Sequence, residues 1–174
     1  MSQTQGMDTT EAKEMFSYLQ KLRQKEVDKS DPLLKYVGKN SPLLFWNDTL
    51  VKVAEARVLD LVKYNYFDHV DKKGRGVNYY IANAGYYLEP EWTENKKDNF
   101  FESLQAGAED ANAVIYDLVI DNGVPSKGHR KHLLGLDDWN VKNVDVGIAY
   151  YRKADGDRCD YITYTVIIIA RHHW

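Results

Sequence analysis

The sequence of 174 residues contains a single cysteine, Cys159, so no internal disulfide can form. This removes the usual mark of an oxidising compartment, but it leaves the compartment itself undetermined. The longest apolar run, residues 166–170, is far shorter than the ~20 residues that a membrane-spanning helix needs. The first fifteen residues also lack the apolar segment of a secretory signal. The sequence therefore predicts neither a transmembrane segment nor a disulfide framework.

Positive charge is dispersed along the chain. The formal net charge is −3, and Lys and Arg are scattered along the chain without a basic stripe, which disfavours nucleic acid as a partner. The sequence has no internal repeat or low-complexity tract, and its length suits one domain of roughly 100–200 residues. We therefore expect a single domain over residues 1–174. Aromatic residues are plentiful, with 13 Tyr, 4 Trp and 5 Phe, and they suit the half-buried walls of a cleft.

Apolar residues recur at helical spacing in several segments. Asp8 is the expected cap of the first helix, and Asn47 or Asp48 is the expected cap of the second. Polar residues 89–99 show no periodicity and predict an exposed insertion. The predicted helices cover residues 9–25, 48–66, 77–84, 109–120 and 128–134.

The C-terminal part of the sequence changes to β-strand patterns. Val144–Tyr151 and Tyr161–Ala170 are rich in β-branched and aromatic residues, and the turn-prone segment 154–157 joins them, which predicts an antiparallel hairpin. Val166–Ile169 is apolar on both faces, so we expect this strand to be central and covered on both sides. Helices followed by buried antiparallel strands predict an α+β layered domain.

Among the five histidines, His69 and His129 are the strongest site candidates. His69 follows Tyr-Phe-Asp at the end of the second predicted helix, and His129 lies in a Gly-His-Arg segment. Either alone would more often be a structural or surface histidine, and sixty residues of separation give no local metal-ligand spacing. His132 shares a helical face with His129 and could join a site, although surface exposure is favoured.

The order of these segments resembles that of the CAP superfamily, the SCP-like extracellular domain of cysteine-rich secretory proteins, venom antigens and plant pathogenesis-related proteins. Residues 41–47 (SPLLFWN) resemble the segment that leads into the family's second helix. Glu102–Gly107 resembles the Gly-Glu-Asn-Ile-Ala-x-Gly motif, and residues 128–130 match Gly-His-Arg. The resemblance covers about residues 10–170. Phe101 replaces the motif's Gly and Ser103 its Asn, and the missing cysteine framework indicates the bacterial-type branch.

This resemblance implies a three-layer α-β-α sandwich with a small, mainly antiparallel sheet. It also implies a cleft with two histidines, which fall on His69 and His129, and a first acid on Glu102. A second acid of the family would fall near Asp121. Two imidazoles and a carboxylate form a plausible site for a divalent metal such as zinc, with a water in the open position. The same residues could equally form a hydrogen-bonded cluster without metal.

The resemblance further implies a protein that is secreted or held in the cell envelope. The first hypothesis is a binding module with a metal-capable cleft, whose ligand could be a protein, a glycan or a lipid. The second is a metal-dependent hydrolase in which Glu102 acts as general base to a bound water. The third is a carrier of a lipid or sterol. The sequence has no recognisable nucleophile motif, which disfavours covalent catalysis and favours the binding module.

Overall fold

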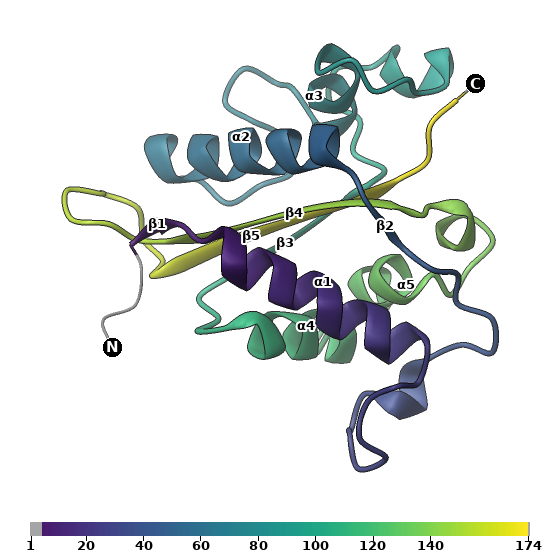
Figure 1. Ribbon diagram of the computed structural model, residues 1–174. Coiled ribbons are helices and arrows are strands. Elements are labelled where there is room, and N and C mark those ends of the chain that lie inside the picture. Colours follow the sequence, from purple (N-terminus) through teal and green to yellow (C-terminus); the bar gives the residue numbers. More distant parts are fainter. Residues whose placement is uncertain (1–4, 174) are drawn as a thin grey trace.

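The computed structural model describes residues 5–173 and has a mixed sheet between two layers of helices (Figure 1). The strands are β1 (Gly6–Met7), β2 (Phe45–Trp46), β3 (Glu102–Ala106), β4 (Asp145–Arg152) and β5 (Thr163–Ala170). The α-helices are α1 (Thr9–Arg23), α2 (Asp48–Tyr64), α3 (Val77–Asn83), α4 (Ala111–Ile120) and α5 (Gly128–Leu134). Short 3-10 turns occupy Leu34–Tyr36, Pro90–Thr93 and Asn140–Lys142.

The sheet has the strand order β1-β4-β5-β3, and β2 pairs parallel with β4. β4 and β5 pair antiparallel from Asp145 opposite Ala170 to Arg152 opposite Thr163. β3 pairs antiparallel with the other side of β5 and forms an edge of the sheet. Every residue of β5 is buried. The predicted antiparallel hairpin and the predicted central position of its second strand are both confirmed.

The two helical layers cover opposite faces of the sheet, α2 and α3 on one face and α1, α4 and α5 on the other (Figure 1). Side chains alternate between the faces of a strand, so β5 supplies both layers. Val166 and Ile168 pack in the core beneath α2, whereas Ile167 and Ile169 pack beneath α1 and α4. This double burial explains the apolar run in the sequence and confirms the α+β, three-layer architecture.

The helix ends follow the predicted capping. Asp8 accepts a hydrogen bond from the backbone N–H of Glu11 at 3.0 Å, and Asn47 accepts one from Leu50 at 3.0 Å. The layer of α2 lies close to the sheet because β4 has a glycine at this crossing. A Cβ at Gly147 would lie 2.2 Å from the carbonyl carbon of Leu50, so a side chain there would push α2 away.

Two local expectations need correction. Residues 89–99 are not simply an exposed insertion, because the ring of Trp92 packs on Trp139 at 5.3 Å between centroids and on Phe101 at 5.5 Å. The strand β3 has no counterpart among the predicted elements. Its polar residues Glu102, Ser103 and Gln105 are all buried, so the sequence shows none of the usual polar–apolar alternation.

Candidate functional site

Strand β3 presents its polar side chains to both helical layers. Glu102 points to the layer of α2, where it contacts Arg57 and His69. The next residue, Ser103, points to the opposite layer, where it contacts His132 of α5. This alternation is the ordinary two-residue period of a strand. Adjacent residues of β3 therefore contact opposite helical layers.

Glu102 is held by a buried arginine. Arg57 Nε donates to Glu102 Oε2 at 2.8 Å and Arg57 Nη2 donates to Oε1 at 3.1 Å, and neither side chain is exposed. His69 Nδ1 lies 3.0 Å from Glu102 Oε1, and the His69 side chain is 40% exposed. A carboxylate between a guanidinium and an imidazole orients both partners by charge-assisted hydrogen bonds. Glu102 thus fixes the exposed His69 ring from beneath.

The network continues from Arg57 into the loop that carries His69. Arg57 donates to the Tyr66 hydroxyl at 2.9 Å and to the Asp68 carbonyl at 2.8 Å, and the Tyr66 hydroxyl donates to Asp60. Burial alone would lower the pKa of Arg57, but the charge of Glu102 and its hydrogen bonds outweigh burial and raise it. Burial and the hydrogen bond to Asp60 raise the pKa of Tyr66. The arginine therefore stays charged and the phenol stays protonated.

His129 belongs to a second acid–histidine pair. Asp121 ends α4 in the left-handed conformation, with φ of 51°, and its side chain is 3% exposed. Its Oδ2 accepts the backbone N–H of His129 at 3.0 Å, and its Oδ1 lies 2.8 Å from His129 Nδ1. Arg130 donates to the carbonyls of Val119 and Ile120 at the end of α4. The Gly-His-Arg segment therefore ties α5 to the end of α4 as well as presenting a histidine.

His132 is buried, not exposed as the sequence suggested. The Ser103 hydroxyl and His132 Nδ1 lie 2.6 Å apart, and His132 Nε2 lies 3.3 Å from the carbonyl of Ile169. Burial lowers the pKa of His132 to about 4, so the ring is neutral at pH 7. Ser103 and His132 are 1% and 6% exposed, which places them in the core and beyond reach of a substrate.

The expected metal site, shared by His69, Glu102 and His129, finds no support in the geometry. Within residues 5–173, no group of three or more His, Cys, Asp and Glu side chains is placed to hold one ion. The physical reason is the separate pairing: Glu102 is engaged by Arg57 and His69, and Asp121 by His129. Nδ1 of each site histidine faces a carboxylate, and Nε2 makes no hydrogen bond to the described part of the chain.

A cleft of about 260 Å³ opens beside His129. It lies between α4, the edge strand β3 and an aromatic pair, Phe67 and Tyr161, whose ring centroids are 5.8 Å apart. Its remaining lining residues are Leu104, Gln105, Ala106, Asp117, Leu118, Asp121, Asn122 and Val124. Gln105 Nε2 donates to Asp117 at 3.0 Å and thereby links β3 to α4 across the cleft. The cleft includes His129 and Asp121 but neither His69 nor Glu102.

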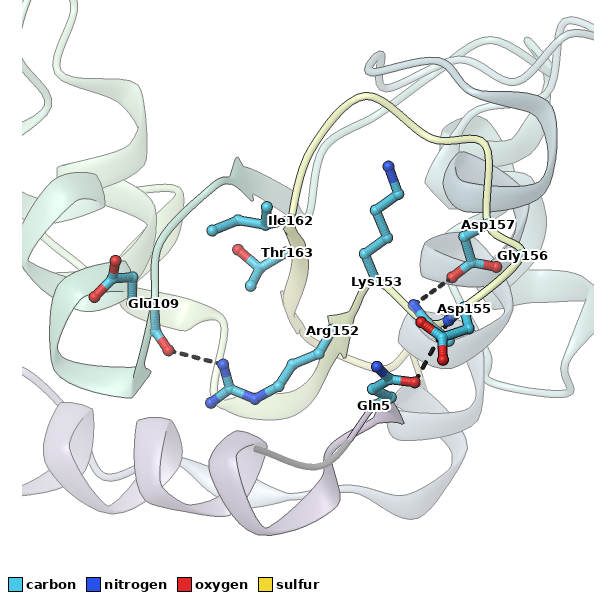
Figure 2. A pocket seen from close by; sticks show the side chains of 10 residues that line it. Gln5, Glu109, Arg152, Lys153, Asp155, Gly156, Asp157, Ile162 and Thr163 are labelled. Carbon is cyan, nitrogen blue, oxygen red and sulfur yellow. Dashed lines mark hydrogen bonds between the residues drawn. The ribbon is translucent and has the colours of Figure 1, made fainter. Parts of the chain in front are cut away.

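A larger cavity of about 660 Å³ lies elsewhere, between the turn of the β4–β5 hairpin and the chain near β1 (Figure 2). Several of its polar groups are already paired with one another. Arg152 donates to the carbonyl of Glu109 at 2.9 Å, and Asp157 accepts the backbone N–H of Ala154 at 2.8 Å. No residue selected from the sequence lines this cavity.

Comparison with known proteins establishes the family. Residues 16–168 match the sequence profile described as CAP: Cysteine-rich secretory protein family, so the chain belongs to this family. The predicted family membership is thereby confirmed. None of the curated proteins matches the chain. The described helices include none that is both long and apolar enough to cross a membrane.

Solved structures with the same fold come from bacteria. An outer surface protein from Borrelia burgdorferi is 20% identical, with a TM-score of 0.65 over 98% of this chain and 100% of that chain. An extracellular protein containing a SCP domain from Bacillus anthracis str. Ames is also 20% identical, with a TM-score of 0.59. That match covers 94% of this chain but only 41% of the Bacillus chain. At this identity the likeness concerns the fold.

Proposed function

We propose that this protein is a binding module that acts outside the cell or at the cell envelope, and that the cleft beside His129 holds its ligand. Two structural neighbours, an outer surface protein and an extracellular protein, support the location. The cleft supports the binding role because aromatic and apolar walls surround a few polar groups, which is the usual composition of a ligand site.

The single observation that carries this proposal is the engagement of Glu102. A general base must place a free oxygen within hydrogen-bond reach of the water it activates. Both oxygens of Glu102 already accept hydrogen bonds from Arg57, one of them is also within 3.0 Å of His69, and the side chain is not exposed. Glu102 is therefore a poor base for hydrolysis but a good support for the His69 ring. This disfavours the metal-dependent hydrolase relative to the binding module.

We propose a divalent cation only in a narrower form than the sequence implied, because the described residues bring no three acid or histidine ligands together. His69 and His129 would be its ligands through Nε2, with Glu102 and Asp121 behind the rings. Zinc-bound histidines commonly donate the other ring N–H to a carboxylate, and both pairs have this arrangement.

The test is a measurement of substrate turnover by the purified protein. The wild type is incubated with zinc and with peptide, ester and glycan substrates, and we expect no cleavage above background. Zinc-dependent cleavage that disappears in Glu102→Gln, in a variant shown by circular dichroism to be folded, would overturn the proposal. His172→Gln is the matched control, because it alters an acid-paired histidine outside the cleft.

A further inference from the structure

The pairing of the edge strand β3 with β5 determines which of its backbone groups are hydrogen-bonded to β5. Ile169 N donates to Phe101 O, and Gly107 N donates to Thr163 O. In an antiparallel pair, backbone groups alternate between the partner strand and the opposite side. The odd-numbered residues of β3, including Ser103 and Gln105, are therefore bonded to β5. The N–H and C=O groups of Leu104 and Ala106 point away from the sheet.

These outward groups face the cleft beside His129. Leu104, Gln105 and Ala106 all line the cleft, although their side chains alternate between the two faces of the sheet. A cavity that contacts three consecutive strand residues runs along the edge of the strand. Within residues 5–173, the backbone N–H and C=O of Leu104 and Ala106 have no hydrogen-bond partner. Such an edge is a template for another strand.

We propose that an extended peptide segment of a partner protein binds this cleft by adding a strand to the free edge of β3. This inference rests on the proposed binding function and names its ligand class. Leu104 and Ala106 would supply up to four backbone hydrogen bonds, spaced by about 7 Å at a rise of about 3.4 Å per residue. Main-chain bonds of this kind provide affinity, and pockets for alternate side chains provide specificity.

The charge of the cleft selects a basic peptide. The described lining contains no Lys or Arg, and its exposed charged residue is Asp117, whereas Asp121 is buried and engaged by His129. Phe67 and Tyr161 line the same cleft and are each 43% exposed. A Lys or Arg side chain suits this arrangement, because its stem packs on the aromatic rings and its charge faces Asp117. An acidic peptide would be repelled.

The decisive variant is Ala106→Pro. Proline lacks the N–H that the added strand needs, and edge strands tolerate proline where the N–H faces away from the sheet. The β5 ladder should therefore persist in this variant, as checked by circular dichroism and thermal melting.

A random heptapeptide phage library is selected on the wild type and on Ala106→Pro. We expect the wild type to enrich peptides with Lys or Arg and without central proline, and their affinity to fall about tenfold or more in the variant.

Amide exchange on a selected peptide complex tests the binding mode directly. The amides of Leu104 and Ala106 should become protected on binding, whereas those of Ser103 and Gln105 are already bonded and should change little. N-methylation of alternate peptide amides removes the donors of the added strand and should abolish binding. Asp117→Asn removes a charge from the cleft and should weaken peptide binding about fivefold and reduce the salt dependence of the affinity.

Failure of strand addition can be separated from failure of the binding module. Peptides that bind wild type and Ala106→Pro equally, without protecting Leu104 or Ala106, would overturn strand addition and leave a binding cleft. A library that yields no peptide specific to the wild type would also overturn it. Cleavage of the selected peptides would instead overturn the proposed function.

Discussion

Arg57 of α2 and Glu102 of β3 lie 45 residues apart in the sequence and form a two-bond ion pair in which neither side chain is exposed. The pair joins one helical layer to the edge of the sheet and positions His69 at the surface. The loss of one partner from a buried pair is costly, because the other charge stays buried without compensation.

Replacement of Glu102 by glutamine should therefore destabilise the protein strongly. We expect Glu102→Gln to lower the free energy of unfolding by about 3–5 kcal/mol, measured by urea denaturation. The double variant Arg57→Met/Glu102→Leu should recover much of this loss, since no charge is then stranded. Glu91→Gln, at an exposed position, is the control and should change stability by less than about 0.5 kcal/mol. Equal effects of Glu102→Gln and Glu91→Gln would contradict the ion pair.

The buried His132 predicts acid sensitivity. Burial lowers its pKa to about 4 in the folded protein, while the unfolded chain takes up the proton near the ordinary histidine pKa of 6.5. The folded-state pKa is depressed, so its contribution to stability is complete above pH 6.5 and is lost as the pH falls toward 4. The loss should be on the order of 3 kcal/mol over this window.

This pH effect is measured by urea denaturation at pH 7 and at pH 4.5. His132→Gln should flatten the dependence, because the glutamine side chain does not titrate. The control His173→Gln replaces an exposed histidine and should leave the slope unchanged. Identical slopes in the wild type and His132→Gln would refute the buried, neutral histidine.

Zinc binding is a separate prediction that calorimetry can test. We expect a stoichiometry of 1:1, and we expect His69→Ala or His129→Ala to weaken binding strongly. An imidazole must be neutral to ligate, so affinity should be lower at pH 5.5 than at pH 7.5. His173→Ala is the control. Unchanged affinity in both site variants would eliminate the two-histidine site without affecting the cleft.

Sterol should bind weakly or not at all. The cleft of about 260 Å³ is too small to enclose a sterol, because pockets that bury a drug-sized molecule measure ~300–1,000 Å³. A sterol would also cover Asp117 and Asp121 without offering them hydrogen bonds, which costs free energy. A titration with dehydroergosterol, repeated with unlabelled cholesterol as competitor, measures this. Saturable and competable binding in the micromolar range would revive the carrier hypothesis.

The sequence was most informative where apolar residues follow a regular period. The stripe Leu50, Val53, Ala54, Val58 and Leu61 predicted α2, and all five side chains are buried. The hairpin of β4 and β5 was predicted on the same basis, because β-branched residues fill both faces of its second strand. In long buried elements, the spacing of the apolar residues alone shows which faces are buried.

The site was less predictable because its partners are distant in the sequence. Arg57 lies on the buried face of α2, seven residues after Leu50. A charged residue at such a position needs a buried partner of opposite charge, and this pattern could have predicted the ion pair. The burial of His132 was not predicted because its hydrogen-bond partners, Ser103 and the Ile169 carbonyl, are distant in the sequence. Strand β3 was missed because its polar residues are satisfied by three different helices.

The placement of Glu102 and Ser103 on opposite faces of β3 makes this strand intolerant of changes in length. An insertion or deletion of one residue inside it would exchange the two faces. A carboxylate would then meet the neutral His132, and a hydroxyl would meet the charged Arg57. Loops before and after β3 can vary in length without this penalty. Relatives of this protein should therefore differ in the loops that flank β3 and agree in the odd–even phase of the strand itself.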